Sequence, residues 1–404
     1  MIRFDSQQSF SHWLSNRPMS WSRALTARAA LRVLPWIGRR GNYSRLTVAR
    51  RNLALLRATA ISWIACKVTE ENLTSAAAAA AGELSRPYLT TVDESYLEAT
   101  DSYAYGSENA AAYAAYVASG DRRAVTGAFH YGTAWFRPHA DGECVASSLV
   151  GAVQSDAEML ENYRFPSNAD EPANKLACQR LWYREPDWFG GVWRECASRL
   201  SAGTSGFECW IDWFERRVAG EERAFDLESG ADRGLMYRLI RQDDAFWSRH
   251  PAIVNAEISE WIAAAGRDRR DFFISYASAD RMIAEEINNV LLRNGYTTFV
   301  QFDDIGTGAN FVREMQRGLA KSERLIAVLS PDYESSDHCQ AEWAAAYAMD
   351  PGATKSTLLQ FLVQPTELNP LSRQVVYTSL IGCDKPTREQ AILNIVRKLL
   401  RHAG

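Results

Sequence analysis

The chain has 404 residues, more than one ordinary hydrophobic core serves, so two or three domains are expected. Its residues are 47% hydrophobic and 23% charged, a globular composition that excludes a disordered or fibrous protein. The net charge of -4 provides no broad basic surface, so neither nucleic acid nor a membrane is predicted as a partner.

The cysteines and the apolar stretches bear on the cellular location. Seven cysteines is an odd number, and no pair has CxxC spacing, so neither a disulfide framework nor a zinc site is predicted. The first residues lack the basic segment and apolar run of a secretory signal. Residues 53–66 are apolar but contain Arg57, and a membrane-spanning helix needs about 20 apolar residues. We therefore expect a cytoplasmic protein in which this stretch is a buried helix.

Residues 1–265 are predicted to form a mainly helical domain. Residues 45–67 have apolar positions at helical spacing and few helix breakers. Two alanine-rich runs, 76–81 and 110–118, also favour helix, and each stops near a glycine. Because alanine permits close approach of helices, the two runs either pack on each other or form separate surface helices.

Tryptophan is concentrated between residues 182 and 261. Trp210, Trp213 and Phe214 are spaced to lie on one face of a helix. Core packing is favoured because these rings bury a large area, and an aromatic cage around a ligand is the alternative. We find no repeat and no family resemblance in this region.

A boundary is predicted at residues 266–270, a short charged stretch that opens with a glycine. It follows a helical pattern at 254–265 and precedes an apolar strand, and glycine commonly stands just past the last turn of a helix. We therefore treat 266–270 as a linker between a domain at 1–265 and a domain at 271–404.

The C-terminal region alternates between short apolar runs and helical patterns. Strands are predicted at 272–276, 296–302, 325–329, 358–363 and 375–377, with helices at 279–294, 312–321, 341–348 and 388–400. Strands that are apolar on both faces and alternate with helices indicate an α/β domain with a parallel five-stranded sheet covered on both sides. Ligands of such sheets bind beyond the carboxyl ends of the strands.

Polar segments follow the first three predicted strands, at residues 275–280, 303–310 and 330–343. The second holds Asp303 and Asp304, which suggest a metal site, but no third carboxylate stands at a regular loop spacing, so no metal is predicted. The same segment lacks the Lys-Ser/Thr pair of a phosphate-binding loop, which disfavours nucleotide hydrolysis.

These segments carry a family resemblance. The run Phe272-Phe273-Ile274-Ser275-Tyr276 resembles the first signature of TIR (Toll/interleukin-1 receptor) domains. Residues 304–311 resemble the BB loop of that family, and residues 329–342 resemble the motif that holds its catalytic glutamate. The resemblance covers roughly 271–404 and implies a flavodoxin-like sheet. Some members of the family are scaffolds that only self-associate, whereas others cleave NAD.

The resemblance implies an NAD-cleaving enzyme with Glu342 as the catalytic residue and NAD as substrate, with no further cofactor. The nicotinamide of NAD is already a cationic pyridinium, so it leaves as a neutral group without a general acid. A single carboxylate then suffices to stabilise the oxocarbenium-like ribose. The products are nicotinamide and ADP-ribose or a cyclic variant of it.

Further contacts are expected from the same resemblance. Ser278, at a helix start, is expected near the pyrophosphate. NAD-cleaving members often have tryptophan where this chain has His338, and Phe302, Phe311 and Trp343 are expected to supply the missing ring surface. Cys339 is expected to pack beneath Glu342 rather than to act as a nucleophile, since only His338 is a nearby base. The expected substrate contacts are Ser278, Phe302, Asp304, Phe311, Cys339 and Trp343.

An NAD-cleaving enzyme must be held in check, because constant activity would poison its own cell. TIR sites are often completed by a neighbouring TIR domain, so the resemblance implies activation by self-association. Residues 1–265 are the expected sensing or assembly region of an immune, antiphage effector, with a phage-derived or operon-encoded activator as a possible partner. The alternative is a non-catalytic TIR scaffold that recruits other proteins.

Overall fold

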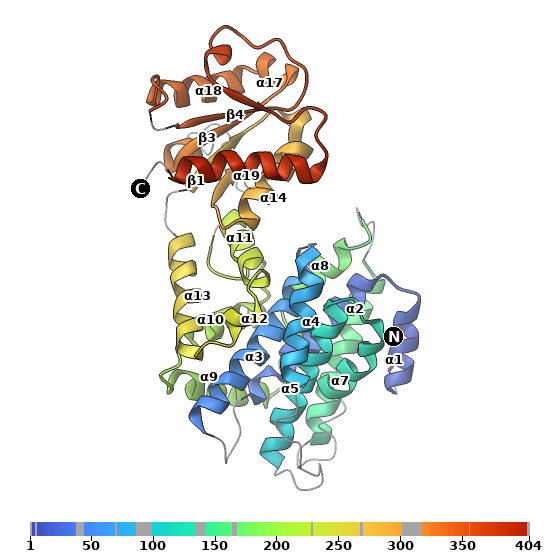
Figure 1. Ribbon diagram of the computed structural model, residues 1–404. Coiled ribbons are helices and arrows are strands. Elements are labelled where there is room, and N and C mark those ends of the chain that lie inside the picture. Colours follow the sequence, from blue (N-terminus) through green and yellow to red (C-terminus); the bar gives the residue numbers. More distant parts are fainter. Residues whose placement is uncertain are drawn as a thin grey trace. The chain divides into compact units, whose positions relative to one another are not determined.

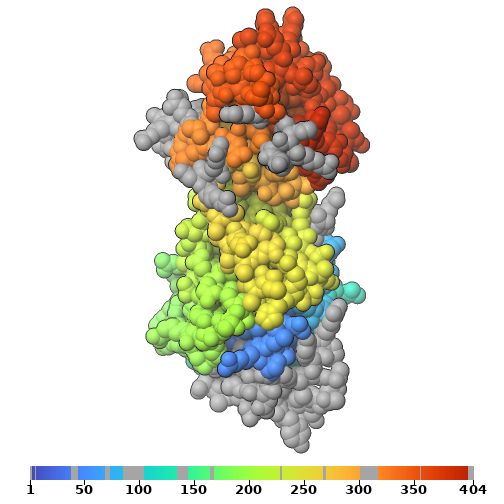
Figure 2. Space-filling model, turned by 60° about the vertical axis from the view of Figure 1, so that its left-hand side comes forward, coloured from blue at the N-terminus to red at the C-terminus, as the bar shows by residue number. Residues whose placement is uncertain are grey.

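The computed structural model describes most of the chain, in two compact units (Figure 1). Contacts group residues 1–225 with 239–260 in one unit, and residues 226–238 with 261–404 in the other. Figure 2 draws in grey the residues outside the described part. The domain boundaries predicted from the sequence stay a prediction, because grouping by contacts does not show which part folds independently. The described residues are 2–4, 6–37, 44–68, 71–85, 99–133, 142–163, 168–227, 229–266, 270–300, 317–354 and 356–401.

The residues before the sheet are helical, as the sequence predicts, and their described part contains no strand. Short 3-10 turns at Leu34–Trp36 and Arg122–Ala124 interrupt the α-helices. The helices are α1 (Gln7–Ser15), α2 (Met19–Val33), α3 (Arg45–Ile64), α4 (Glu71–Ser85), α5 (Ala99–Ala118), α6 (Val125–Gly132), α7 (Gly142–Glu161), α8 (Glu171–Ala177), α9 (Phe189–Ser201), α10 (Glu208–Ala219), α11 (Ser229–Ile240), α12 (Asp244–Trp247) and α13 (Pro251–Ala265).

The two alanine-rich runs belong to α4 and α5, and these helices pack on each other. Ala77, Ala80, Ala111 and Ala115 are fully buried, so the paired arrangement holds and the surface alternative is wrong. The apolar stretch at 53–66 is a buried part of α3 and the residues after it. No described helix is long and apolar enough to cross a membrane.

The aromatic face of α10 is part of the core. Trp210 and Trp213 are each 1% exposed, Phe214 is completely buried, and the Trp210 indole N–H donates to Asn255 Oδ1 at 2.9 Å. A ligand cage needs accessible ring faces, so core packing is the correct interpretation. The same unit buries the Arg28 and Arg32 guanidiniums against Asp156 Oδ2, at 2.9 and 2.7 Å. Burial lowers the pKa of Arg32 to about 10.

The C-terminal unit contains a five-stranded sheet with the order β2-β1-β3-β4-β5, in which every pair is parallel. This is the predicted fold class. The strands are β1 (Arg270–Ser275), β2 (Thr298–Val300), β3 (Ser322–Leu329), β4 (Leu358–Leu362) and β5 (Tyr377–Ser379). The helices are α14 (Arg281–Arg293), α17 (Pro331–Ser335), α18 (Asp337–Met349) and α19 (Lys385–Arg401), with 3-10 turns at Ser278–Asp280 and Ser372–Gln374.

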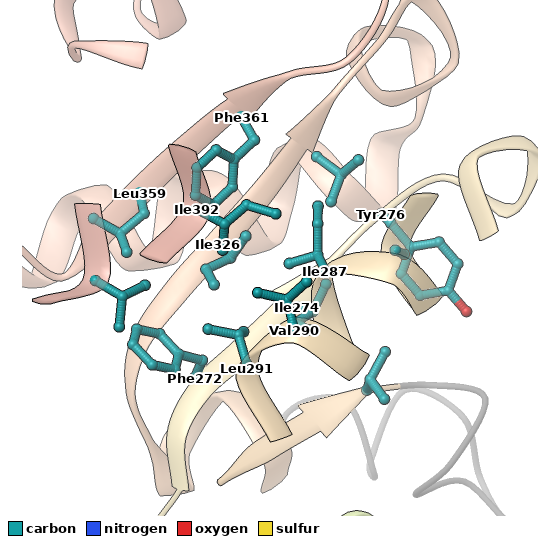
Figure 3. Packing of buried hydrophobic residues seen from close by; sticks show 14 of the residues in the cluster. Phe272, Ile274, Tyr276, Ile287, Val290, Leu291, Ile326, Leu359, Phe361 and Ile392 are labelled. Carbon is teal, nitrogen blue, oxygen red and sulfur yellow. The ribbon is translucent and has the colours of Figure 1, made fainter. Parts of the chain in front are cut away.

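Helices cover both faces of the sheet, as the doubly apolar strands require. Alternate residues of β1 point to opposite faces: Phe272 and Ile274 meet α14 and α19, whereas Phe273 packs toward α18. Figure 3 shows the first of these two cores, with Ile287 of α14 and Ile392 of α19 against the strands. Burial of these side chains fixes the strand register and therefore the places where the strands end.

Several element boundaries differ from the sequence prediction. The helix expected at 341–348 begins at Asp337, because Ser336 caps it by accepting a hydrogen bond from the Cys339 backbone N–H. The expected helix at 279–294 begins with a 3-10 turn. The last strand lies two residues later than expected, because its side chains are exposed and apolar content could not locate it. Residues 301–302 of the expected strand at 296–302 and residues 312–316 of the expected helix at 312–321 lie outside the described residues, and residues 317–321 are helical.

Candidate functional site

The site is built at the carboxyl edge of the sheet, where β1 and β3 end side by side. Ser275 is the last residue of β1, and Ser330 follows β3 directly. Ser330 caps the short helix α17 by accepting a hydrogen bond from the Tyr333 backbone N–H at 3.0 Å. The two caps at Ser330 and Ser336 set the direction of α17 and α18, and so place the side chains that face the edge.

Glu342, the predicted catalytic residue, projects from α18 toward the end of β1. Its Oε2 accepts a hydrogen bond from Ser275 Oγ at 2.7 Å, and Ser275 Oγ lies 2.9 Å from the Tyr333 hydroxyl oxygen. Since the single Ser275 proton goes to the carboxylate, the Tyr333 hydroxyl is left to donate, either to Ser275 Oγ or to the Cys339 carbonyl at 3.3 Å. Tyr333, Ser275 and Glu342 therefore form a chain of hydrogen bonds in which the last acceptor is the Glu342 carboxylate.

Burial favours the protonated form of every titratable member of this set. Burial raises the pKa of Tyr333 well above its usual value and raises the pKa of Cys339 to about 11. Burial also raises the pKa of Glu342, while the Ser275 hydrogen bond and His338 lower it. Among the described residues no lysine or arginine forms an ion pair with Glu342. The charged neighbour that lowers the pKa of Glu342 is therefore His338, and not a lysine or arginine.

A second buried carboxylate, Asp280, lies at the same edge and was not singled out from the sequence. It is 3% exposed, and its oxygens accept hydrogen bonds from Ser330 Oγ at 2.5 Å and from Gln364 Nε2 at 3.1 Å. Burial raises the pKa of Asp280, Asp332 raises it further, and the two donors lower it. An acidic residue closing the polar turn after β1 was the only sequence signal for it.

The other predicted contact residues have different surroundings. Ser278 is exposed, in the 3-10 turn after β1, and Cys339 is buried within the first turn of α18. Trp343 is 2% exposed: its indole N–H donates to Gln360 Oε1 at 2.8 Å, and its ring stacks on Tyr347. The expected role of Trp343 as a ring surface for a ligand is therefore corrected to a core residue. Phe302, Asp304 and Phe311 lie outside the described residues.

Two further observations limit what the described part of the chain offers. It holds no group of three or more His, Cys, Asp or Glu side chains arranged for a metal ion. A cavity of about 480 Å³ lies at the amino edge of the sheet, lined by residues that include Asp271, Tyr296 and Glu323. Because ligands of parallel sheets bind at the carboxyl edge, we place the candidate site at Glu342 and not in this cavity.

Comparison with known proteins assigns a family to part of the C-terminal unit. The family model described as TIR domain matches residues 272–393. Among solved structures, the chain is similar to the crystal structure of the TIR domain of the Toll-related Receptor TRR-2 from the lower metazoan Hydra magnipapillata. The identity is 26%, the match covers 32% of this chain and 98% of that chain, and the TM-score is 0.28. No curated protein matches the chain. The family match and the five-stranded parallel sheet identify residues 272–393 as a TIR domain, whereas the preceding residues are assigned to no family.

Proposed function

We propose that the TIR domain cleaves NAD between nicotinamide and ribose, with Glu342 as the carboxylate that stabilises the reacting sugar. The observation that carries this proposal is the state of Glu342. It is a partly buried carboxylate at the ligand-binding edge of a parallel sheet, held by Ser275 and free of any ion pair in the described part of the chain. A carboxylate with these properties is available to a developing positive charge.

The chemistry needs little more from the protein than this charge. The electron pair of the bond between ribose C1′ and the ring nitrogen stays with the nitrogen, so cationic nicotinamide leaves as a neutral molecule. The ribose carbon becomes oxocarbenium-like, and the Glu342 carboxylate stabilises it. Water then adds to the carbon and loses a proton, which gives ADP-ribose. Attack by a nitrogen of the adenine instead gives a cyclic product, and product identification separates these two outcomes.

Other parts of the edge provide contacts for the rest of the dinucleotide. Ser278 is exposed and stands at the start of the helical segment that follows β1, where backbone N–H groups attract a phosphate. We assign the pyrophosphate to this turn. Phe302 and Phe311 are proposed to contact the nicotinamide or the base, and Asp304 is proposed as a further substrate contact. No further cofactor is needed in this scheme.

Regulation is proposed to come from assembly. TIR domains commonly self-associate, and we propose that contact between TIR domains completes the site. In this scheme residues 1–265 sense the trigger or drive assembly, and the protein acts as an immune effector that removes NAD on infection. A phage-derived or operon-encoded protein is the proposed activator.

The experiment that tests the proposal measures free nicotinamide after the concentrated full chain is incubated with NAD. The chain is expected to release nicotinamide, and Glu342→Ala is expected to abolish the release while leaving the far-ultraviolet circular dichroism spectrum unchanged. Release by Glu342→Ala at the parent rate would remove Glu342 from the mechanism. An absence of release from the assembled parent chain would favour the scaffold alternative.

A further inference from the structure

Asp280 is a buried carboxylate whose charge is balanced by hydrogen bonds alone. Its oxygens accept from Ser330 Oγ and Gln364 Nε2, and in the described part of the chain no cation pairs with it. Burying a carboxylate without a cation is unfavourable, so its retention needs a compensating role. Asp280 stands in the turn that follows β1, and its two partners, Ser330 and Gln364, follow β3 and β4, so the carboxylate joins three segments of the carboxyl edge.

The link through Ser330 leads to Glu342. Ser330 Oγ donates to Asp280 and at the same time accepts from the Tyr333 backbone N–H, which starts α17. Tyr333 is completely buried, and its hydroxyl lies within hydrogen-bonding distance of Ser275 Oγ, the group that donates to Glu342. Each step is a hydrogen bond of 3.0 Å or less. Rotation of the Ser330 hydroxyl would change the start of α17 and, with it, the place of Tyr333.

We propose that Asp280 is a positioning residue for Glu342: by holding the Ser330 hydroxyl it fixes α17, and α17 in turn holds Ser275 in the orientation that donates to Glu342. Asp280 itself touches no substrate. Its catalytic consequence rests on the proposed NAD cleavage, whereas its effect on Glu342 does not depend on that function. A loss of Asp280 weakens the Ser275 hydrogen bond without removing Ser275.

The direction in which the pKa of Glu342 changes when Asp280 is replaced distinguishes this positioning role from a direct electrostatic effect. Removing a negative charge near Glu342 lowers the pKa of Glu342, because a carboxylate ionises more easily without a like charge nearby. Losing the hydrogen bond from Ser275 raises the pKa of Glu342, because that bond stabilises the ionised form. The remaining titratable groups that face Glu342 are His338, Cys339 and Tyr333. An Asp280→Asn variant keeps all three residues.

The test is an NMR titration of the Glu342 side-chain carboxyl in the full chain, with Glu342→Gln used to assign the signal. Asp280→Asn is expected to move the titration of Glu342 to higher pH. Ser330→Ala keeps the Asp280 charge but removes the link, so it is expected to move the titration in the same direction and serves where Asp280→Asn fails to fold. A shift to lower pH, or no shift, in the folded variants would overturn the proposal.

Two control variants complete the design. Gln364→Ala removes the other donor to Asp280 but keeps the Ser330 link, so the Glu342 titration is expected to stay unchanged. Asp350→Asn alters another buried aspartate, just after α18, which accepts hydrogen bonds from Thr354 and is not linked to Ser275. It is expected to lower stability and leave the titration unchanged. A shift in Asp350→Asn as large as that in Asp280→Asn would show general loosening instead of positioning.

Kinetics add a second, separate test. If the parent chain cleaves NAD, Asp280→Asn is expected to lower kcat about tenfold or more with little change in KM, since misplacement of a reacting group acts mainly on the transition state. If the parent chain does not cleave NAD, the proposed function fails, and the titration of Glu342 still decides whether Asp280 positions it.

Discussion

At the scale of single residues, the partly buried carboxylate of Glu342 lowers the stability of the folded chain. Burial raises the pKa of Glu342 above its ordinary value, so the folded state binds a proton more tightly than the unfolded chain does. The ionised carboxylate is thus a net cost to folding at pH values above this raised pKa. The cost disappears as the pH falls and the group becomes protonated in both states. Under the proposed function, this cost is offset because the cationic substrate makes use of the Glu342 charge.

This cost predicts how Glu342→Gln changes stability. The variant should unfold at a higher temperature than the parent at neutral pH, because the neutral amide avoids burial of a charge. The gain should shrink as the pH falls below the raised pKa and toward the pKa of an unfolded glutamate, where the parent is also uncharged. Thermal unfolding at a series of pH values measures this. A gain that grew toward acidic pH would show that Glu342 is stabilised as an anion in the folded protein.

The hydrogen bond from Ser275 sets the pH range in which Glu342 is charged. Ser275→Ala removes a hydrogen-bond donor to the ionised form of Glu342, so the pKa of Glu342 rises further. The acid limb of the pH–rate profile for NAD cleavage therefore moves to higher pH. We also expect kcat at the plateau to fall about tenfold from loss of orientation. Ser335→Ala, in an exposed serine of α17, is the matched control and should leave the limb in place. An unshifted limb in Ser275→Ala would exclude this hydrogen bond from the mechanism.

At the scale of elements, α18 is anchored to the sheet by Trp343. Its indole N–H donates to Gln360 Oε1, and Gln360 Nε2 donates to the carbonyls of Ser372 and Val375 beyond β4. One buried side chain of β4 thus joins the helix that carries Glu342 to the segment before β5. Because buried polar groups are costly when a partner is removed, this set of bonds makes the position of α18 specific.

Because Trp343 anchors α18 to the sheet, its replacement is expected to lower the stability of the fold without changing the binding of NAD. Trp343→Phe leaves Gln360 Oε1 without its donor and should reduce the free energy of unfolding by about 1–3 kcal/mol. The KM for NAD should change little, because the Trp343 ring is enclosed in the core. Tyr347→Phe keeps the ring that stacks on Trp343 and is the matched control. Urea unfolding and steady-state kinetics measure the two quantities, and a large rise in KM with unchanged stability would restore Trp343 as a ligand contact.

Sequence patterns located some elements better than others, for physical reasons. Strands β1, β3 and β4 are buried on both faces, so runs such as Phe272–Ile274 could be recognised from apolar content alone. The side chains of strand β5 are mostly exposed, and its position is set by backbone pairing with β4. Backbone pairing leaves no signal in the types of residue, so the sequence could not locate this strand. Glu342 was singled out through a family motif, and its catalytic role stays a prediction. Asp280 and the core position of Trp343 depend on contacts between distant segments, which a single sequence does not show.

At the scale of the whole molecule, the chain joins a helical unit to a unit that carries the TIR domain. The helical unit has its own core and its own buried ion set, in which Asp156 accepts from Arg28 and Arg32. Contacts also assign residues 226–238 to the TIR-containing unit, where Gly234 of α11 faces Leu292 of α14. A segment from the middle of the chain therefore packs against a helix of the TIR domain within this unit.

The most direct measurement of the central claim is nicotinamide release from NAD by the full chain and by Glu342→Gln, over a wide range of protein concentration. Glu342→Gln keeps the size and shape of the side chain and removes only its charge. The account predicts release by the parent chain, with a rate per molecule that rises as the protein self-associates, and no release by the variant at any concentration. Equal release by the two proteins, or none from the parent even when it is assembled, would contradict the account.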